Sequence, residues 1–375
     1  MTATSEAKGA AAALPPVHVI GTGLIGTSIG LALSSVGVDV TLEDQSETSA
    51  ALARDLGAGR TTGEVRPGLV VVAGPPDVSP RLVLGALERW PEAVVTDVTS
   101  VKQVVLLDLV RSGVPIDRYL GSHPMAGRER SGAISARADL FTGRAWVLCP
   151  HDGSDPSATA LVARLAQATG AAVTTLSPQE HDEAVAAVSH VPQVAASLVA
   201  ARLEHLSDHA IGLAGPGVRD VTRIAASDPG LWTQILSGNA PAVAAVLRDV
   251  AADLGRVVDA LEALGAGEDD VADAPGARAV LARSIADGNA GHARIPGKHG
   301  APPATYAVVS VVVDDRPGEV ARLLTDIGAA GVNMEDLRLD HGLGLPFGLA
   351  EVSVLPAAAG PLTEALTARG WRIHS

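Results

Sequence analysis

The stretch "VHVIGTGLIGTSIG", residues 17–30, joins a short apolar run to a helical pattern through three glycines. The apolar residues 17–20 favour a buried strand, and the pattern that begins at Leu24 favours a helix. Glycines spaced as G-x-G-x-x-G permit a tight turn and let a pyrophosphate approach the start of the helix. The stretch therefore predicts the dinucleotide-binding turn of a parallel α/β sheet. The expected cofactor contacts are Gly21, Gly23, Leu24, Ile25 and Gly26.

An acidic residue follows at the distance that such a turn requires. In dinucleotide-binding units a carboxylate about 20 residues further on bonds the ribose 2′-hydroxyl. Asp44, in "VTLEDQS", occupies that place, with Glu43 beside it. A carboxylate there repels a 2′-phosphate, so the sequence favours NAD over NADP as the cofactor. A glycine turn without a ligand is the alternative.

Short apolar runs alternate with helical patterns up to about residue 176. Runs of strand type lie at 17–20, 39–42, 69–74, 93–98, 145–149 and 171–176. Continuous apolar strands separated by helices are typical of a parallel sheet that is covered on both faces. We therefore expect an α/β fold with an N-terminal Rossmann-like, NAD-binding domain over residues 16–176.

The pattern changes at Ser177, which with Pro178 and Glu180 forms the start signal of a helix with a capping box. Asp228 and Pro229 repeat the start signal, and strand signals are missing up to about residue 290. We expect an all-helical substrate and dimerisation domain over 177–290, because long apolar helices after a nucleotide-binding unit often form a dimer core. A Gly- and Pro-rich linker over 291–305 then leads to a small α+β domain over 306–375. The expected order there is strand, turn at 317–318, amphipathic helix, two strands and a final helix.

Composition narrows the class of protein. A chain of 375 residues is long enough for two or three domains. The formal net charge of -14 argues against nucleic acid or an anionic membrane as a partner. The single cysteine, Cys149, excludes an intrachain disulfide and is expected to be a small buried hydrophobe. Without a secretory signal or a membrane span in the sequence, we expect a cytoplasmic protein with a short disordered leader.

A histidine precedes a proline in "GSHPMAGRERSGA", residues 121–133. Pro124 favours an extended conformation at His123, and the glycines around it predict sharp turns. In "VVTDVTSVKQVV" a strand is expected to end near Val98 and a helix to begin near Ser100. Ligands of open parallel sheets bind at the carboxyl ends of strands, so Ser100 and His123 are predicted to face the nicotinamide. The alternatives are a helix-capping serine, in a capping box with Gln103, and a solvated loop histidine.

Five motifs follow one another along the chain: "GTGLIG", "TDVTSVK", "SHPMAGRERSG", "SHVPQ" and "GPGVRDVTRIAASDPGLW". In this order and approximate spacing the sequence resembles the prephenate dehydrogenase family. The last segment, with "DRPGEVARLLTDIGAAGVN", resembles an ACT-type regulatory domain. The resemblance covers nearly the whole chain from residue 16, and five ordered motifs are far more specific than a glycine turn alone.

The resemblance implies NAD-dependent oxidative decarboxylation of prephenate to 4-hydroxyphenylpyruvate, a step of tyrosine biosynthesis. Hydride leaves the ring carbon that bears the hydroxyl, the ring carboxylate departs as carbon dioxide, and aromatisation drives the step. The step needs a base on the hydroxyl, and imidazole, with a pKa near 6.5, suits neutral pH. The resemblance assigns that role to His123 and places Ser100 in a hydrogen bond near the histidine and the substrate hydroxyl. The ACT-type domain implies feedback by tyrosine as an effector.

Three more residues correspond to substrate-binding positions of the family. His190 helps to position the substrate, unless it is a histidine that interrupts a helix and bonds the backbone. Arg223 binds a substrate carboxylate with its planar fork, unless it forms a structural ion pair with Asp220. Gln193 stands where many relatives carry a second histidine. Because Gln193 is neutral, it favours the keto side chain of prephenate over the ammonium of arogenate.

Other functions remain open at this point. Arogenate dehydrogenase performs the same chemistry on the amino analogue. A β-hydroxyacid dehydrogenase would need a lysine in the helical domain, and residues 177–290 contain none. A non-catalytic, amino-acid-sensing NAD-binding regulator would not need His123, Ser100 and Arg223 together.

Several conspicuous residues are given no part in the chemistry. Lys102 is expected to be structural or electrostatic. His205 and His209 lie four residues apart, but without a third ligand they indicate a solvated helix face, and no metal site is expected. Glu129 and Trp232 correspond to family positions near the pocket.

Overall fold

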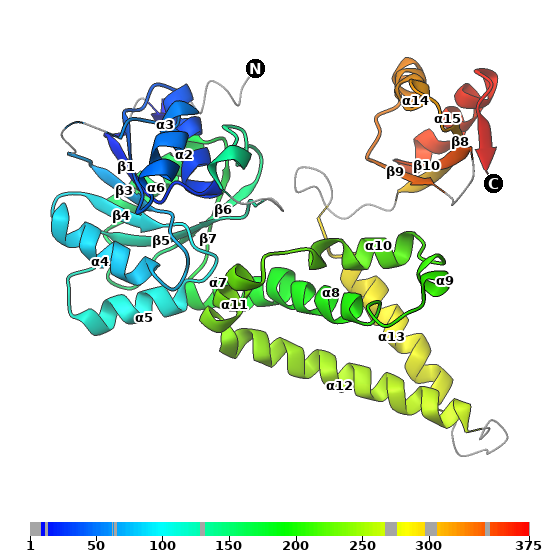
Figure 1. The fold of residues 1–375 in the computed structure, drawn as a ribbon. Coiled ribbons are helices and arrows are strands. Elements are labelled where there is room, and N and C mark those ends of the chain that lie inside the picture. Colours follow the sequence, from blue (N-terminus) through cyan, green and yellow to red (C-terminus); the bar gives the residue numbers. More distant parts are fainter. Residues whose placement is uncertain are drawn as a thin grey trace. The chain divides into compact units, whose positions relative to one another are not determined.

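The computed structural model describes residues 9–11, 14–61, 63, 66–127, 132–266, 276–296, 306–341 and 346–374. The predicted leader lies mostly outside these residues. The chain forms two compact units, Met1–Ala252 and Asp253–Ser375, and Figure 1 labels many of their elements. The division falls inside one long helix, α12 (Ala240–Gly265).

A seven-stranded sheet forms the centre of the first unit. Its strands are β1 (Val17–Ile20), β2 (Val40–Glu43), β3 (Leu69–Val72), β4 (Val94–Asp97), β5 (Tyr119–Pro124), β6 (Ala145–Cys149) and β7 (Ala172–Thr175). They are ordered β2-β1-β3-β4-β5-β6-β7, and all neighbours are parallel except β5 and β6. The chain turns to opposite sides after β1 and β2, so the carboxyl ends of β1 and β3 border the crevice where such sheets bind ligands.

Helices cover both faces of the sheet, as the continuous apolar strands predict (Figure 1). One apolar core packs under α2 (Leu24–Ser35), α3 (Glu47–Asp55) and α6 (Pro156–Ala168), and includes the fully buried Ile29 and Leu165. The other packs under α4 (Ser79–Arg89) and α5 (Gln103–Ser112), and includes Val83 and Leu109. The expected Rossmann-like architecture is confirmed.

Strand β5 was absent from the predicted strands. The sequence around His123 predicts a corner with sharp turns on either side, and that prediction is wrong on the side of Gly121. Gly121 lies inside β5, where an added Cβ would approach the Tyr119 hydroxyl to 3.1 Å and Lys102 Cδ to 3.2 Å. Pro124 is tolerated because the β4–β5 ladder ends at Gly121, so no bond to β4 requires an N–H from the proline. His123 is extended, as the following proline predicts.

From Ser177 the first unit is helical, as expected. The elements are α7 (Pro178–Val185), the π-helical turn η2 (Ala186–His190), α8 (Val191–Ala201), α9 (Asp208–Ile211), α10 (Pro216–Thr222), the 3-10 turn η3 (Arg223–Ala225) and α11 (Pro229–Gly238). The Ser177–Glu180 capping box forms in both directions, and Asp228 caps α11 through the Leu231 N–H. The π-turn ends two residues before Pro192, which removes a backbone donor and interrupts regular helix bonding.

The run Pro178–Ala201 is apolar and long enough to cross a membrane by length and composition alone. Within the unit, 33% of its apolar window is buried. The same run carries His181, Asp182, His190 and Gln193, which are all buried. Buried polar groups that find protein partners are typical of an interior helix, so the run is a structural part of the unit.

The second unit contains α13 (Ala277–His292) and a four-stranded antiparallel sheet. Its order along the chain is β8 (Ala307–Asp314), α14 (Glu319–Ala329), β9 (Asp336–His341), β10 (Phe347–Val354), α15 (Pro356–Ala368) and β11 (Arg372–His374), and the strands lie as β11-β8-β10-β9. The small α+β unit is confirmed, but β11 was missed because three residues, "RIH", are too short to show alternation. Helix α13 ends two residues into the predicted linker, and residues 297–305 of that linker lie outside the described residues.

Candidate active site

The glycine turn after β1 has the geometry that its spacing predicts. Gly21 has a φ of +99°, and a Cβ on Gly26 would lie 1.9 Å from the Gly21 carbonyl oxygen, so neither position accepts a side chain. Gly23 is different, because a Cβ there would meet nothing within 4 Å. Gly23 is exposed and is the N-cap of α2, whose first residues, Leu24 and Ile25, are partly exposed. The turn thus leaves room for a phosphate at a helix N-terminus, which fits the pyrophosphate of a dinucleotide.

Asp44 follows β2 and lies against this turn. Its Oδ2 accepts hydrogen bonds from the Thr22 N–H at 2.7 Å and from the Thr22 hydroxyl at 2.9 Å. Its Oδ1 accepts from the Ser46 N–H at 2.9 Å. These bonds fix the carboxylate beside the turn, where a ribose would lie, and leave part of its acceptor capacity free.

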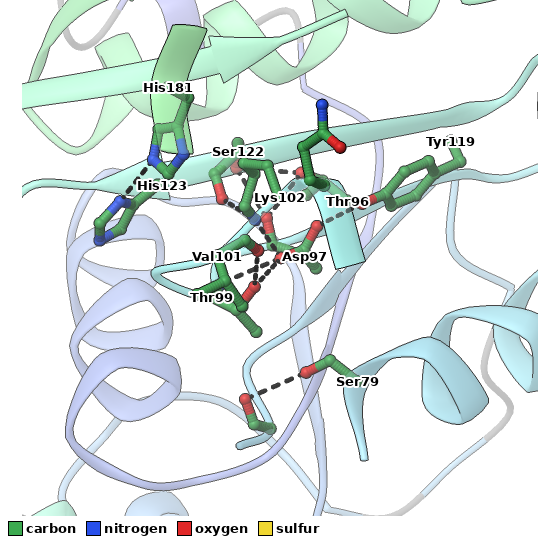
Figure 2. A network of polar contacts seen from close by, with 12 residues as sticks. Ser79, Thr96, Asp97, Thr99, Val101, Lys102, Tyr119, Ser122, His123 and His181 are labelled. Atoms are coloured by element: carbon green, nitrogen blue, oxygen red, sulfur yellow. Dashed lines mark hydrogen bonds and ion pairs between the residues drawn. The ribbon is translucent and has the colours of Figure 1, made fainter. Parts of the chain in front are cut away.

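A buried polar network lies below the carboxyl end of β4 (Figure 2). The Lys102 ammonium forms an ion pair with Asp97 and donates to the Ser122 carbonyl oxygen at 2.7 Å. The Tyr119 hydroxyl donates to Asp97 Oδ2 at 2.6 Å, and burial raises the pKa of Tyr119 well above its usual value, with the Asp97 charge adding to the effect. Thr99 donates to Asp97 Oδ1 from its N–H and its hydroxyl. Lys102 is therefore structural and electrostatic, as predicted.

Helix α5 begins at Gln103 rather than near Ser100, so the alternative of a Ser100–Gln103 capping box is not found. No side chain of the helix's own N-terminal segment caps it. The cap comes instead from Asp182 on α7, which accepts from the Lys102 N–H and the Gln103 N–H, both at 2.9 Å. Because Asp182 takes this role, the Ser100 hydroxyl does not serve as the cap. Ser100 is partly exposed in the loop between β4 and α5.

His123 lies near the end of β5 and faces a second histidine that the sequence did not single out. His123 Nδ1 is 2.9 Å from His181 Nε2, and the two rings meet edge to face (Figure 2). His181 Nδ1 is 2.8 Å from Asp182 Oδ1. His181 is fully buried, whereas His123 is partly exposed. The imidazole of His123 is thus held from one side and open on another.

Burial lowers the pKa of His123 well below its usual value, and neighbouring His181, Lys102 and His190 lower it further. A low pKa keeps this imidazole neutral at pH 7, with one ring nitrogen free to accept a proton. Such a group is a competent general base.

His190 is 1% exposed and ends the π-turn η2. Its Nδ1 lies 3.2 Å from Asn239 Nδ2, which also donates to the Asp182 carbonyl oxygen at 2.7 Å. The Trp232 ring lies edge to face with His190, at 6.1 Å between centroids. Burial lowers the pKa of His190 to about 4, so this ring is neutral at physiological pH.

The two other predicted substrate residues lie on the helical side of the unit. Gln193 is 6% exposed, with its Nε2 3.4 Å from the Ser197 hydroxyl, while the Ser227 hydroxyl donates to its Oε1 at 3.3 Å. Arg223 is exposed at the start of η3, and within the described part of the chain no ion pair to Asp220 or another acid is found for it. Glu129 lies outside the described residues.

Sequence reasoning missed His181, Asp182 and Asn239, which join the two sides of the site. His181 and Asp182 stand in the first turn after a strong capping box, where polar residues are ordinary, and Asn239 follows the end of α11. The available signal was an acidic residue next to a histidine, shortly after the helix start signal at Ser177.

A cofactor turn and a held imidazole at the same edge of one parallel sheet define a class of protein: a nicotinamide-dinucleotide-dependent oxidoreductase. The chain matches the prephenate dehydrogenase nucleotide-binding domain over residues 29–175 and the prephenate dehydrogenase dimerization domain over residues 177–270. These two matches cover more than half of the chain. The chain belongs to the prephenate dehydrogenase family.

Individual relatives agree with this assignment. The chain is 37% identical to "Probable prephenate dehydrogenase NovF" of Streptomyces niveus, over 95% of this chain and 99% of that protein. It is 32% identical to the prephenate dehydrogenase of Bacillus subtilis, over 60% of this chain and 64% of that protein. Among solved structures, the prephenate dehydrogenase from A. aeolicus in complex with hydroxyphenyl propionate and NAD+ is similar with a TM-score of 0.61 and 26% identity. That similarity covers 73% of this chain and 99% of the other.

Proposed function

We propose that this protein catalyses the NAD-dependent oxidative decarboxylation of prephenate to 4-hydroxyphenylpyruvate, with His123 as the base. The observation that carries the proposal is the state of His123. This imidazole has a pKa well below its usual value, a partner on Nδ1 and partial exposure at the carboxyl end of the sheet. The family membership and the cofactor turn after β1 support the same reaction.

Different residues of this chain perform different parts of the proposed reaction. The turn at residues 21–26 and Asp44 bind and orient the dinucleotide, which when bound accepts the hydride from the ring carbon that bears the hydroxyl. His123 takes the hydroxyl proton as hydride leaves that carbon and the ring carboxylate departs as carbon dioxide. The proton returns to the same oxygen once the ring is aromatic. Ser100, in the adjacent loop, hydrogen-bonds the reacting hydroxyl, and exposed Arg223 binds a carboxylate of the substrate.

A direct assay tests this function. The purified protein is mixed with prephenate and NAD, and the absorbance of the reduced nicotinamide is followed together with the release of carbon dioxide. We expect equal amounts of both products. Reduction without decarboxylation, or no reduction at all, would contradict the proposal, and the second result would favour the non-catalytic amino-acid-sensing regulator.

We further propose prephenate rather than arogenate as the preferred substrate. Gln193 is neutral, and its neighbours Ser197 and Ser227 are neutral hydroxyl groups. An ammonium ion that is removed from water needs a compensating acid, which these three residues do not supply. The test is kcat/KM for both substrates in the wild type and in Gln193→Glu, which we expect to move the ratio toward arogenate. A wild-type preference for arogenate contradicts this specificity and leaves the chemistry intact.

We propose that the active protein is a homodimer formed through the helical segment. The helical segment of the first unit leaves large apolar side chains exposed, including Val188 at 69%, Leu198 at 60% and, in the turn between α9 and α10, Leu213 at 79%. Soluble proteins rarely leave such groups uncovered over a contiguous area. The match of residues 177–270 to a dimerization domain supports the same conclusion. Sedimentation of the full chain at micromolar concentration should give twice the mass of 37.8 kDa.

We propose that the small α+β domain over residues 306–375 is an ACT-type domain that binds tyrosine and lowers activity at a distance. Its βαββαβ order and its four-stranded antiparallel sheet support this assignment. A chain that ends near residue 300 should keep activity with prephenate and lose its sensitivity to tyrosine. Inhibition that persists in the shortened chain would place the effector at the active site instead.

A further inference from the structure

The side chains of His123, His181 and Asp182 form a continuous line of polar contacts, which runs from the helical part of the first unit to the proposed base. His123 belongs to β5, whereas His181 and Asp182 belong to α7. The line runs from His123 Nδ1 to His181 Nε2 at 2.9 Å, and from His181 Nδ1 to Asp182 Oδ1 at 2.8 Å. His181 and Asp182 are 0% and 3% exposed, so water does not compete for these contacts.

The line determines which nitrogen of each ring carries hydrogen. An ionised carboxylate only accepts, so His181 presents Nδ1–H to Asp182. The Nε2 of a neutral His181 is then an acceptor, and His123 must present Nδ1–H to it. The remaining nitrogen of His123, Nε2, is left unprotonated, which is the form that a general base requires.

Asp182 is itself fixed by contacts that do not involve the histidines. Its two oxygens accept the Lys102 and Gln103 N–H groups at the start of α5, where the helix dipole favours a negative charge. Asn239 donates to the backbone carbonyl oxygen of the same residue. Asp182 therefore connects α5, α7 and the end of α11 through hydrogen bonds. Because His181 contacts both Asp182 and His123, the ring of His123 is held by the same set of contacts.

We propose that His181 is a positioning residue that, anchored by Asp182, holds His123 in the Nδ1-protonated tautomer with Nε2 directed toward the substrate. When His123 accepts the hydroxyl proton on Nε2, its Nδ1–H stays bonded to His181 Nε2, and no proton leaves His123 toward His181. The proposal rests on the proposed function of His123 as the base. According to the proposal, residues of the helical segment determine how His123, a residue of the sheet, is oriented.

Two substitutions of His181 test the proposal, because each keeps a different one of its two contacts. In His181→Asn the amide reaches only the Nδ1 position, so it keeps the contact with Asp182 and loses the contact with His123. In His181→Gln an amide oxygen reaches the Nε2 position and accepts from His123. We expect His181→Asn to lower kcat about 10-fold to 10²-fold, the range found for groups that orient functional histidines. We expect His181→Gln to recover most of that loss, with KM for prephenate and NAD binding unchanged in both.

His151→Asn is the matched control. His151 is a partly buried histidine of the same unit, and its ring nitrogens bond the Ile116 carbonyl oxygen and the Gly153 N–H. Its substitution should leave kcat unchanged. Equal kcat values for the two His181 variants would overturn the proposal, because a merely structural role does not distinguish them.

A spectroscopic measurement on the wild type keeps the proposal testable if a variant fails to fold. Nitrogen-15 NMR of the histidine rings distinguishes protonated from unprotonated nitrogens, and the His123 signals are those that vanish in His123→Asn. We expect hydrogen on Nδ1 of His123 at pH 7. Hydrogen on Nε2 would overturn the proposal even if the enzyme is active, whereas a wild type without activity would overturn the proposed function and leave this tautomer measurable.

Discussion

The sheet side and the helical side of the first unit hold their polar groups in different ways. On the sheet side, Asp97 is held by residues two and five positions further on, Thr99 and Lys102, together with the neighbouring strand. On the helical side, Asp182 acts across 80 positions of sequence, on the N–H of Lys102. The sheet side carries His123 and the cofactor turn. The helical side supplies long-range contacts, from Asp182 to the start of α5 and from His181 to His123.

This division leads to different expectations for substitutions on the two sides. Changes on the sheet side should affect the chemical step, the cofactor or the stability of the fold. Changes on the helical side should affect how the substrate is held or, at His181, how His123 is oriented. Four substitutions, in decreasing order of expected effect, test whether the two sides differ in this way.

The largest effect is expected for His123→Asn, which removes the base from the sheet side and keeps a polar side chain of similar size. Kcat with prephenate should fall on the order of 10²–10⁴-fold, the usual contribution of a general base. Steady-state kinetics measure the loss, and calorimetric titration with NAD should show unchanged affinity. Turnover near the wild-type value would remove His123 from the chemistry.

Lys102→Met tests the buried ion pair between Lys102 and Asp97. The substitution leaves the buried carboxylate of Asp97 without its cation, and breaking a buried pair in this way costs about 3–5 kcal/mol. Urea unfolding at a fixed protein concentration measures the loss of stability. Arg111→Met is the control, because its pair with Asp108 is exposed and contributes about 0–1 kcal/mol. Equal effects of the two substitutions would show that the Asp97–Lys102 pair is not a structural anchor.

Arg223→Ala tests the helical side. A charge-assisted bond to a carboxylate contributes about 1.5–3 kcal/mol, which corresponds to an increase in KM for prephenate of about 10-fold to 10²-fold. Kcat should change less. Arg202→Ala, also an exposed arginine of the helical segment, should leave KM unchanged. An unaltered KM in Arg223→Ala would mean that another residue binds the carboxylate.

The smallest effect is expected for Asp44→Ala. The substitution removes a charged partner of the ribose and the bonds to Thr22, so the affinity for NAD should fall about tenfold. The affinity for NADP should rise relative to that for NAD because a repulsive charge is lost. Titrations with both nucleotides measure the ratio, and an unchanged ratio would transfer the discrimination to Glu43 or another group.

Local sequence patterns were sufficient to predict those parts of the molecule that are held by contacts between residues close in sequence. The glycine turn, Asp44 and the helix starts at Ser177 and Asp228 each depend on residues a few positions apart, or on spacing that the fold repeats. Cys149 is likewise buried as predicted, and burial raises the pKa of its thiol to about 12.

Long-range contacts account for the errors. The start of α5 was misplaced because its cap, Asp182, lies 79 positions away from Gln103 in the sequence. Strand β5 was missed because Gly121 and Pro124 resemble turn residues, although Gly121 is needed under Lys102 and Pro124 lies beyond the β4 ladder. His181 was missed because its function depends on a partner on β5 that no local pattern reveals.

The pH dependence of kcat/KM for prephenate tests the central claim most directly, since it reports the protonation state of the base in the free enzyme. His123 acts only when it is unprotonated, and burial and its cationic or histidine neighbours hold its pKa well below 6.5. Kcat/KM should therefore rise with pH, reach its plateau below pH 7 and show an acid limb with a midpoint under 6.5 that is absent in His123→Asn. An acid limb with a midpoint above 7, or one that persists unchanged in His123→Asn, would contradict the assignment of His123 as the base.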